Sequence, residues 1–387
     1  MATFPDFLNS FDLDSNKKGK EFEHIFVKWF LKNDPFWSTQ VDQIWLWNDY
    51  PDRWGRDCGV DHVFKHKNGE FWAIQAKCYD PKYSIKLDDI KGFLADSNAP
   101  IINKRLLIAT TDRIGDNARV VIDIQEKPVI LYLYSDFAKS KIDYPRNISE
   151  LQTAKLKQHP SPDSDHPHQL EAIDAVEKGF KENDRGQLVM ACGTGKTYIT
   201  LWVKERISAK ATLVLVPSLN LLSQILHEWT FAMNKPFDVL CVCSDESVSK
   251  KKDNDEFIQS VKDLAFPVTL DIQQIKKFLK CEGEKVIFST YQSSPLIAEA
   301  QKSPDTPDFD LVIADEAHRC SGKAESAFAT VLDNKKIRAR KRLFATATPV
   351  IYSISRKRKI GESGVNITDM SDINKLSNTQ LDLIRQE

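Results

Sequence analysis

The chain has 387 residues, 41% of them hydrophobic, which is enough for two or three domains with ordinary cores. Lys and Arg number 54 and Asp and Glu 55, so the net charge is −1, and any binding to nucleic acid has to use local patches rather than overall charge. There is no run of about 18 apolar residues and no secretory signal, and seven cysteines without a C-x-x-C pair favour reduced thiols, so we expect a cytoplasmic protein with no membrane partner.

The first predicted element is a helix over residues 19–32. Its apolar side chains recur at helical spacing and form one buried stripe, which consists of Phe22, Ile25, Phe26, Trp29 and Phe30. Glu21 and Glu23 flank this stripe. The spacing alone does not show whether either glutamate is a solvated surface residue or part of a site.

A β-hairpin is predicted next. Strand-like runs over residues 60–65 and 71–77 are separated by Lys67-Asn68-Gly69-Glu70, and an Asn-Gly pair between two such runs is a strong hairpin signal. On the second strand Gln75 and Lys77 share a face, because the side chains of a strand repeat with a period of two.

The register of this hairpin decides whether Asp61 joins that face. A two-residue Asn-Gly loop places Asp61 opposite Ala76, whose side chain points to the other face. A three-residue loop pairs Asp61 with Gln75 and requires Gly69 in the left-handed region. In the second arrangement a carboxylate, an amide oxygen and a lysine converge, which is a set that can hold Mg²⁺ and stabilise charge on a phosphodiester.

The segment Gly59-Val60-Asp61, followed by Gln75-Ala76-Lys77 and preceded by Phe22-Glu23, resembles the Mrr-like branch of the PD-(D/E)xK nucleases, in which Gln replaces the usual second acid. The resemblance implies double-stranded DNA as substrate and Mg²⁺ as cofactor. It assigns the principal metal ligand to Asp61, the second ligand to Gln75, the catalytic lysine to Lys77 and an assisting carboxylate to Glu23.

The rest of this region alternates between helix and strand patterns. Helices are predicted over residues 88–97 and 116–125, and strands over 105–110 and 129–134. We therefore expect a small α/β nuclease domain with a mixed sheet over residues 1–150. A polar linker that contains Pro160 and Pro162 follows over residues 151–166, and Pro167 comes directly after it.

The stretch from Met190 to Thr197 closes an apolar run and opens a helical pattern, so it predicts a strand, a glycine turn and a helix N-terminus. Such a turn is a phosphate cradle, in which backbone N–H groups and the helix dipole face the ligand, the lysine reaches the β/γ-phosphates and the threonine holds Mg²⁺. The residues concerned are Gly193, Thr194, Gly195, Lys196 and Thr197. Met190 stands where the usual motif begins with Gly, so the alternative is a glycine-rich turn that binds nothing.

Four further apolar runs are typical of buried parallel strands, over residues 212–216, 239–243, 286–289 and 311–314. The last run ends in Asp315-Glu316-Ala317-His318. An acid at the carboxyl end of a strand opposite a phosphate loop holds the Mg²⁺ of bound nucleotide, which is the role we expect for Asp315. The next acid, Glu316, can orient or deprotonate the attacking water.

Together these motifs resemble the first RecA-like lobe of a DEAH-type superfamily 2 helicase or translocase, which implies a parallel-sheet P-loop lobe over residues 167–350 that binds ATP. The resemblance assigns adenine reading to Gln169, although His166 stands where an arginine is usual. It assigns contacts with the DNA backbone to Pro217, Ser218, Thr290 and Gln292. It assigns the coupling of hydrolysis to DNA movement to Thr346 and Thr348. For the hydroxyl residues, ordinary capping of strand ends is the alternative.

An Mrr-like nuclease followed directly by such a lobe resembles the N-terminal part of Type ISP restriction-modification enzymes, which implies an ATP-dependent DNA restriction endonuclease. These enzymes continue through a second RecA-like lobe, a coupling domain, a methyltransferase and a target-recognition domain. Residues 351–387 consist of a basic run and a polar tail that we expect to be poorly ordered, and they are too few for that lobe.

Two explanations of this length stay open. We expect a truncated or split product that binds nucleotide weakly and does not translocate, with a separate chain supplying the second lobe and the methyltransferase in the split case. The alternative is a catalytically silent remnant that only binds DNA or a partner protein.

Overall fold

The computed structural model describes residues 2–11, 14–55, 59–153, 155–156, 160–162, 166–244, 260–320, 322–323, 327–349 and 367–368. The tail expected over residues 351–387 lies outside the described residues apart from 367–368, as do parts of the linker expected over 151–166. The chain divides into two compact units, residues 1–159 with 262–267 (unit 1) and residues 160–261 with 268–387 (unit 2).

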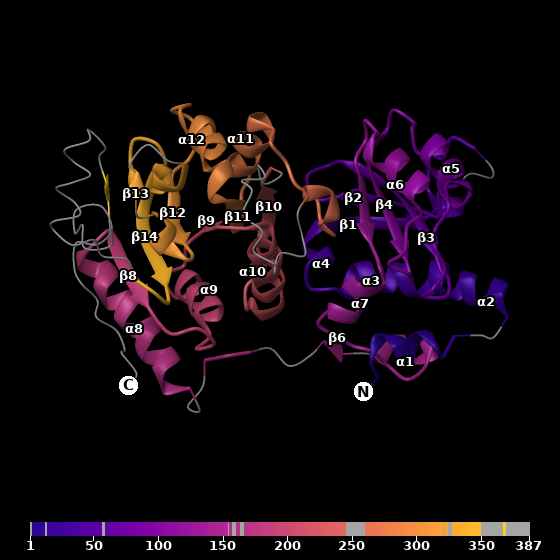
Figure 1. Ribbon diagram of the computed structural model, residues 1–387, viewed down its shortest axis with the longest axis horizontal. Helices are drawn as coiled ribbons and strands as arrows, with labels where there is room; N and C mark the ends of the chain where they lie inside the picture. The colour runs from indigo at the N-terminus through magenta and orange to yellow at the C-terminus, as the bar shows by residue number, and fades with distance from the viewer. Residues whose placement is uncertain are drawn as a thin grey trace. The chain divides into compact units, whose positions relative to one another are not determined.

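Unit 1 is built on a five-stranded mixed sheet in the order β1-β2-β3-β4-β5 (Figure 1). The strands are β1 (Val41–Leu46), β2 (His62–His66), β3 (Phe71–Lys77), β4 (Ile102–Ala109) and β5 (Val129–Tyr132). The first three pair antiparallel and the last three parallel. The parallel crossovers contain α5 (Leu87–Asp96) and α6 (Asp116–Asp123), whose buried residues form one core with Ala73, Leu107 and Leu131 of the sheet.

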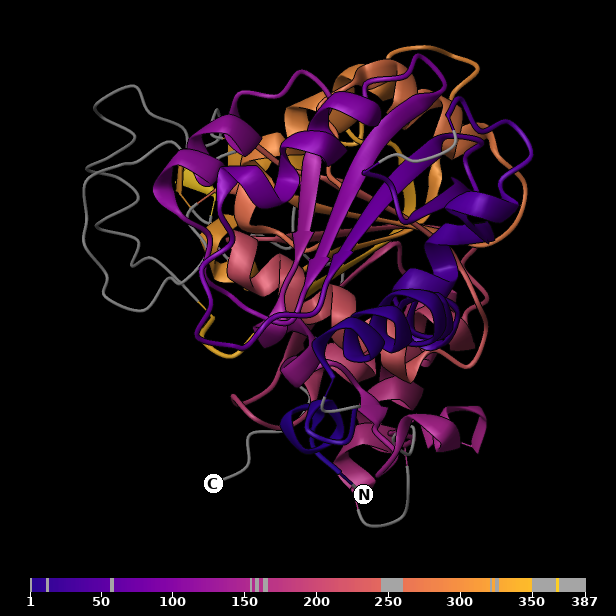
Figure 2. The ribbon, with the colours of Figure 1, turned by 90° about the vertical axis from the view of Figure 1, so that its right-hand side faces the viewer.

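The other elements of unit 1 are short. They are α1 (Phe4–Leu8), α2 (Ser15–Lys20), η1 (Glu21–Val27), α3 (Lys28–Asn33), α4 (Trp37–Gln40), η2 (Trp47–Asp49), α7 (Tyr134–Lys139), η3 (Ile148–Thr153), and the paired strands β6 (Ile142–Asp143) and β7 (Lys155–Leu156). Figure 2 looks onto the sheet of unit 1, with the helical segment from α2 to α3 in indigo across one end of its strands.

The helix expected over residues 19–32 contains an irregularity that its spacing did not indicate. Its middle part, η1, is a π-helix, a rare form that is frequently found at functional sites. Phe22, Phe26 and Phe30 are buried, as expected, but Ile25 is 49% exposed and Val27 is buried in its place. The prediction that Ile25 lies in the stripe is therefore wrong, because the wider π turn moves the buried face toward i, i+4 spacing.

The hairpin has the register of the three-residue loop. β2 and β3 pair His62 with Ile74 and Lys65 with Phe71, and the same register continued by one residue places Asp61 beside Gln75. Gly69 has a φ of 93°, in the left-handed region that this loop requires. The sequence left two registers open, and the structure selects the one that joins Asp61 to Gln75.

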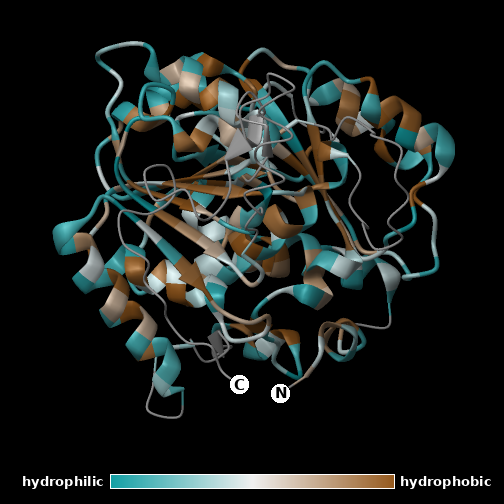
Figure 3. Ribbon diagram, turned by 60° about the vertical axis from the view of Figure 1, so that its left-hand side comes forward, coloured by the Kyte–Doolittle hydropathy of each residue, from teal (hydrophilic) through white to brown (hydrophobic). Residues whose placement is uncertain are grey.

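Unit 2 is built on a six-stranded parallel sheet in the order β10-β11-β9-β12-β14-β8. Its strands are β8 (Arg185–Val189), β9 (Ala211–Val216), β10 (Asp238–Val242), β11 (Lys285–Thr290), β12 (Phe309–Ala314) and β14 (Ala339–Thr346). Its helices are α8 (Pro167–Glu182), α9 (Lys196–Arg206), α10 (Leu219–Ala232), α11 (Ile272–Lys280) and α12 (Ser294–Gln301). The strands of unit 2 are mainly brown in Figure 3, whereas the helices alternate between apolar and polar residues. The expected fold class, a mixed-sheet α/β domain followed by a parallel-sheet P-loop lobe, is confirmed.

The remaining elements of the described residues are short 3₁₀ helices and one pair of two-residue strands. They are η4 (Val261–Asp263), η5 (Tyr291–Ser293), η6 (Ala317–Cys320) and η7 (Ala327–Leu332), with β13 (Gly322–Lys323) paired to β15 (Ile367–Thr368). No helix within the described part of the chain has the length and apolar character needed to cross a membrane.

Residues 262–267 belong to unit 1 although they lie between β10 and β11 in the sequence. Leu264 and Phe266 are each 2% exposed, and the Phe266 ring packs against Phe36 with ring centroids 5.8 Å apart. Asp263 accepts a hydrogen bond from the Arg119 guanidinium at 2.6 Å. This segment is therefore a packed part of unit 1.

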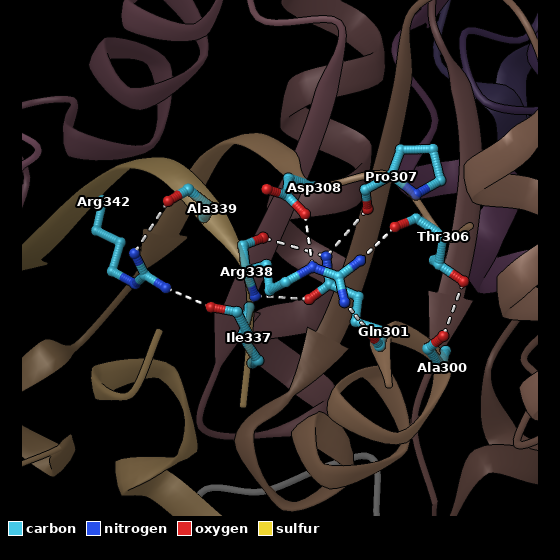
Figure 4. A network of polar contacts seen from close by, with 9 residues as sticks. All are labelled: Ala300, Gln301, Thr306, Pro307, Asp308, Ile337, Arg338, Ala339 and Arg342. Carbon is cyan, nitrogen blue, oxygen red and sulfur yellow. Dashed lines mark hydrogen bonds and ion pairs between the residues drawn. The ribbon is translucent and has the colours of Figure 1, made fainter. Parts of the chain in front are cut away.

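Two arginines hold the chain that leads into β14 (Figure 4). Arg342 is fully buried, and it donates to the carbonyl oxygens of Val331 at 2.9 Å and of Ile337. Arg338 pairs with Asp308 at 2.6 Å and donates to carbonyl oxygens, including that of Gln301. Because these bonds satisfy carbonyl groups that would otherwise be buried unpaired, they fix the start of the strand that ends at Thr346.

Candidate active sites

Asp61 is held against β3 by its backbone and by its side chain. Its N–H donates to the carbonyl oxygen of Ile74 at 2.8 Å, and its Oδ2 accepts from the N–H of Ala76 at 2.7 Å. Ala76 lies between Gln75 and Lys77, so the carboxylate of Asp61 is fixed at the end of β3 where both predicted partners are found. The bond to Ala76 uses one carboxylate oxygen and leaves Oδ1 for a ligand.

Glu23 of η1 joins this group. Burial raises the pKa of Asp61 to about 7, and the negative charge of Glu23 adds to this effect. The hydrogen bond from Ala76 N–H opposes the rise, as do the charges of Lys77 and His24 to a smaller extent. The pKa of Glu23 is raised mainly by burial, which Lys77 and Lys20 oppose. The structure therefore brings Glu23, Asp61 and Lys77 into one electrostatic group, from elements up to 54 positions apart in the sequence.

Gln75 lies beside Asp61 and is 4% exposed. Its Nε2 donates to the carbonyl oxygen of Gly59 at 3.1 Å, whereas its buried Oε1 has no hydrogen-bond partner. A buried amide oxygen without a partner is costly unless a ligand supplies one.

These residues fit a hard divalent cation. The cluster offers the carboxylates of Asp61 and Glu23 and the amide oxygen of Gln75. Within the described residues no group of three or more His, Cys, Asp or Glu side chains is placed to hold a metal ion. Carboxylate and amide oxygens are the ligands that Mg²⁺ prefers, and Mg²⁺ commonly keeps several waters. The orphaned Oε1 of Gln75 is the feature that a cation would explain.

Two histidines near Asp61 were not suggested by the sequence. His24 lies 3.2 Å from Glu23 and faces solvent. His62 is fully buried, both of its ring nitrogens lack a partner, and burial lowers its pKa to about 3, which keeps the ring neutral. Neither residue belongs to a motif, so only the three-dimensional placement of η1 over the hairpin shows them.

The phosphate loop of unit 2 has the predicted geometry. Gly193 and Gly195 have φ values of 80° and 86°, and α9 begins at Lys196. The Lys196 ammonium donates to the carbonyl oxygens of Met190 at 3.0 Å and Ala191 at 3.3 Å, so it lies over its own loop. Thr194 and Thr197 are partly exposed at the loop and at the first turn of the helix.

Gln169 lies directly against this loop. Its Nε2 donates to the carbonyl oxygen of Thr194 at 3.4 Å, and a Cβ added to Gly195 would lie 2.6 Å from the same nitrogen. The neighbouring His168 also lies 3.2 Å from the Thr194 oxygen. The start of α8 is thereby placed beside the phosphate loop, where an adenine-reading residue is expected.

Asp315 and Glu316 follow β12 on the same edge of the sheet. Burial raises the pKa of Asp315 to about 6, and the negative charge of Glu316 adds to this effect, whereas the charge of Lys196 lowers the pKa. Glu316 has a φ of 48°, which is uncommon for a residue other than glycine and is typical of strained functional positions. The two predicted acids and the predicted lysine therefore lie within electrostatic reach of one another.

Thr346 lies between the predicted phosphate loop and the acids that follow β12. It ends β14, which lies between β12 and β8, and its carbonyl oxygen accepts from the N–H of Met190 at 3.0 Å. Its Oγ1 lies 3.0 Å from His318 Nδ1, which is 3.2 Å from Glu316. The N–H of Thr348 donates to the same hydroxyl at 3.2 Å. A series of polar contacts through Thr346 and His318 thus joins the predicted phosphate loop to Glu316.

Among the four residues that resemblance assigns to DNA, Gln292 is exposed. Ser218 caps α10 by accepting from Leu221 N at 3.4 Å, and Pro217 is buried. Thr290 is 1% exposed and its hydroxyl donates to Ser293. These bonds favour the capping explanation for the two hydroxyl residues, and their contact with DNA stays a prediction.

Two family models match separate parts of the chain. Residues 32–154 match a family described as restriction endonuclease, and residues 164–351 match the family described as Type III restriction enzyme, res subunit. The "Probable helicase A859L" of African swine fever virus, isolate Tick/Malawi/Lil 20-1/1983, is 33% identical over 187 residues, which are 48% of this chain and 19% of the viral protein.

One solved structure is similar to nearly the whole chain. The ATP-dependent Type ISP restriction-modification enzyme LlaBIII bound to DNA is 30% identical with a TM-score of 0.77, covering 97% of this chain. A nuclease-deletion mutant of the Type ISP enzyme LlaGI covers 56% of this chain at 35% identity, with a TM-score of 0.41. The chain spans 24% of the length of the LlaBIII chain and 19% of that of LlaGI. The chain therefore consists of an Mrr-like restriction endonuclease domain followed by a res-subunit helicase domain, as in the corresponding part of a Type ISP restriction-modification enzyme.

Proposed function

We propose that this chain is the nuclease and first motor lobe of an ATP-dependent DNA restriction endonuclease, which hydrolyses phosphodiester bonds of double-stranded DNA with Mg²⁺. The observation that carries the proposal is the group at the end of β3, where Asp61 and the unpartnered Oε1 of Gln75 lie with Lys77 and Glu23. The similarity to LlaBIII, which was solved bound to DNA, supports DNA as the substrate.

The roles in unit 1 follow from the chemistry of each side chain. Asp61 and Gln75 would hold Mg²⁺ with assistance from Glu23, and the bound ion would stabilise charge at the scissile phosphate. The ammonium of Lys77 orients the attacking water or stabilises the developing negative charge. The bond from Ala76 N–H keeps the Asp61 carboxylate in one orientation at the end of the strand.

The roles in unit 2 concern ATP. Lys196 and Thr197 would contact the phosphates and the nucleotide's Mg²⁺, with Asp315 holding that ion and Glu316 the attacking water. Gln169 would read adenine from the start of α8. In the helicase family that the sequence resembles, ATP lies between two lobes, so we expect this chain to bind nucleotide and to turn it over quickly only when a second lobe is supplied, by another segment or by a partner chain.

The proposal also includes the cellular compartment of the protein. Cys192 and Cys281, within the described residues, are free thiols exposed to solvent. Exposed free thiols are typical of a reducing compartment, which supports a cytoplasmic protein.

The test is nicking of supercoiled plasmid by the purified chain with Mg²⁺, with and without ATP. Lys77→Ala should lose cutting, whereas Lys67→Ala, at an exposed lysine in the turn of the same hairpin, should keep it. Cutting that Lys77→Ala retains would reject the proposed site. DNA binding without any cutting, with or without ATP, would favour the alternative of a catalytically silent DNA-binding protein.

A further inference from the structure

Gly59 is held on three sides, although it belongs to no helix or strand. Its N–H donates to Oδ2 of Asp96 in α5 at 2.7 Å, and its carbonyl oxygen accepts from Gln75 at 3.1 Å. A Cβ at this position would lie 2.5 Å from the backbone nitrogen of Phe93 and 2.6 Å from the carbonyl carbon of Gly92. The segment before Asp61 is therefore pressed against α5 and bonded to its last residue.

The Gly59 carbonyl determines which way the Gln75 amide points. A carbonyl oxygen can only accept a hydrogen bond, so the NH₂ group of Gln75 has to face it, and the amide oxygen has to face the other way. That oxygen is the buried Oε1 without a partner, on a residue that the strand register places beside Asp61. The orientation of the oxygen that would reach a cation is thus determined by a backbone group 16 residues earlier in the chain.

We propose that Asp96 is a positioning residue of the nuclease site, which acts through Gly59 on the amide of Gln75. Asp96 fixes the Gly59 peptide on α5, the Gly59 carbonyl fixes the amide of Gln75, and the amide oxygen is thereby presented to Mg²⁺. This inference rests on the proposed nuclease function of unit 1. Asp96 lies 35 residues after Asp61 in the sequence and belongs to none of the motifs.

The same geometry gives a reason for glutamine at position 75. A glutamate carboxylate there would place an oxygen against the Gly59 carbonyl oxygen, so the bond would be replaced by repulsion between two acceptors. It would also add a third carboxylate to a group in which Glu23 and Asp61 already interact. Gln75→Glu should therefore weaken the site, although an added negative charge alone would strengthen cation binding.

The experiment uses the full chain and measures two quantities: Mg²⁺ affinity by calorimetry without DNA, and the Mg²⁺ concentration for half-maximal plasmid nicking. Asp96→Ala should weaken Mg²⁺ binding and raise the half-maximal concentration by about 10-fold, which is the lower end of the loss on removing a group that orients a ligand. Asp96→Asn keeps an oxygen acceptor for Gly59 N–H, so it should restore most of the affinity. The control is Asp88→Ala, at an exposed residue of the same helix whose carboxylate pairs with Lys91.

Each outcome decides between specific possibilities. Wild-type Mg²⁺ dependence in Asp96→Ala, or an Asn variant no better than the Ala variant, would overturn the role of Asp96 while leaving the nuclease intact. Gln75→Glu with tighter Mg²⁺ binding than the wild type would overturn the role of the Gly59 carbonyl. A wild-type chain that shows no Mg²⁺ binding dependent on Asp61 would reject the proposed function itself, and the positioning role with it.

Discussion

The two sites of this chain are built in different ways. In unit 1 the side chains that would contact Mg²⁺ are already bonded to backbone groups: Asp61 to Ala76 and Gln75 to Gly59. In unit 2 the phosphate loop is open to solvent, with Gly193 exposed, and the Lys196 ammonium lies over the loop's own carbonyl groups. If these residues act as proposed, the nuclease site is preorganised on a sheet, whereas the nucleotide site would have to rearrange the Lys196 side chain when it binds phosphate.

The difference indicates where each site is vulnerable. A preorganised site fails when the backbone that holds it moves, even if every catalytic side chain is kept. A loop site of backbone N–H groups and one lysine fails mainly through the loss of that lysine or of the loop conformation. Variants that disturb one site without the other can therefore test the comparison.

The largest effect is expected for Gly59→Ala. The added Cβ would meet the backbone of Gly92 and Phe93 at 2.5 to 2.6 Å, and backbone atoms cannot move aside as a flexible side chain can. We expect unit 1 to be destabilised by about 3 kcal/mol and plasmid nicking to be lost. Thermal unfolding and nicking would measure this, and ATP binding in unit 2 should be unchanged.

The matched control is Gly92→Ala. A Cβ at that position meets nothing within 4 Å, and alanine is the better helix former inside α5. It should leave nicking intact and raise stability slightly. If Gly59→Ala behaved like this control, the packing of Gly59 on α5 would not matter for the site.

The next effect concerns the pH dependence of stability in unit 1. Asp34 is 4% exposed, its Oδ1 accepts from Phe36 N and Trp37 N at 3.0 Å each, and burial raises its pKa to about 6. The folded state therefore holds the proton of Asp34 more tightly than the unfolded state does. Below pH 4 this proton contributes about 3 kcal/mol to the free energy of unfolding, and the contribution is lost as the pH rises through 6.

Asp34→Asn keeps an oxygen acceptor but does not titrate. Its free energy of unfolding should therefore fall less than that of the wild type between pH 4 and pH 7, as measured by denaturant titration at several pH values. Equal slopes for the two proteins would show that Asp34 does not carry this dependence. Other buried carboxyls such as Asp136, whose pKa burial also raises to about 6, would keep part of the slope in both proteins.

A third variant isolates unit 2. Lys196→Ala removes the charge expected to contact the nucleotide phosphates, and charge-assisted hydrogen bonds contribute about 1.5 to 3 kcal/mol. ATP affinity should fall by about 10- to 100-fold, measured by calorimetry, while Mg²⁺-dependent nicking without ATP stays at the wild-type level. Loss of nicking in this variant would show that the two sites are not independent.

The sequence predicted the parts of each site that local patterns determine. A period of two placed Gln75 and Lys77 on one face, and a glycine turn between strand and helix identified the phosphate loop. The sequence left the register of Asp61 open, because an Asn-Gly pair is compatible with hairpin loops of two or three residues. Only the observed pairing of His62 with Ile74 resolves that choice.

Other features depend on contacts that no linear pattern contains. Ile25 is exposed because η1 is a π-helix, and helical periodicity assumes a regular turn. Asp96 and Gly59 meet across 37 positions, and residues 262–267 pack in unit 1 although more than 100 residues separate them from it in sequence. Such long-range packing arises from the tertiary fold and has no signature in local sequence.

The smallest effect is expected for Gln169→Ala, and it separates two roles for this side chain. If Gln169 reads adenine, losing one or two neutral hydrogen bonds should weaken ATP binding by about 5-fold and leave GTP binding unchanged. If its role is only to brace the phosphate loop through the Thr194 carbonyl, as the 3.4 Å contact in the structure allows, ATP and GTP affinities should fall together. Calorimetry with both nucleotides distinguishes these outcomes, because the loop contacts phosphates that the two nucleotides share, whereas only the base differs.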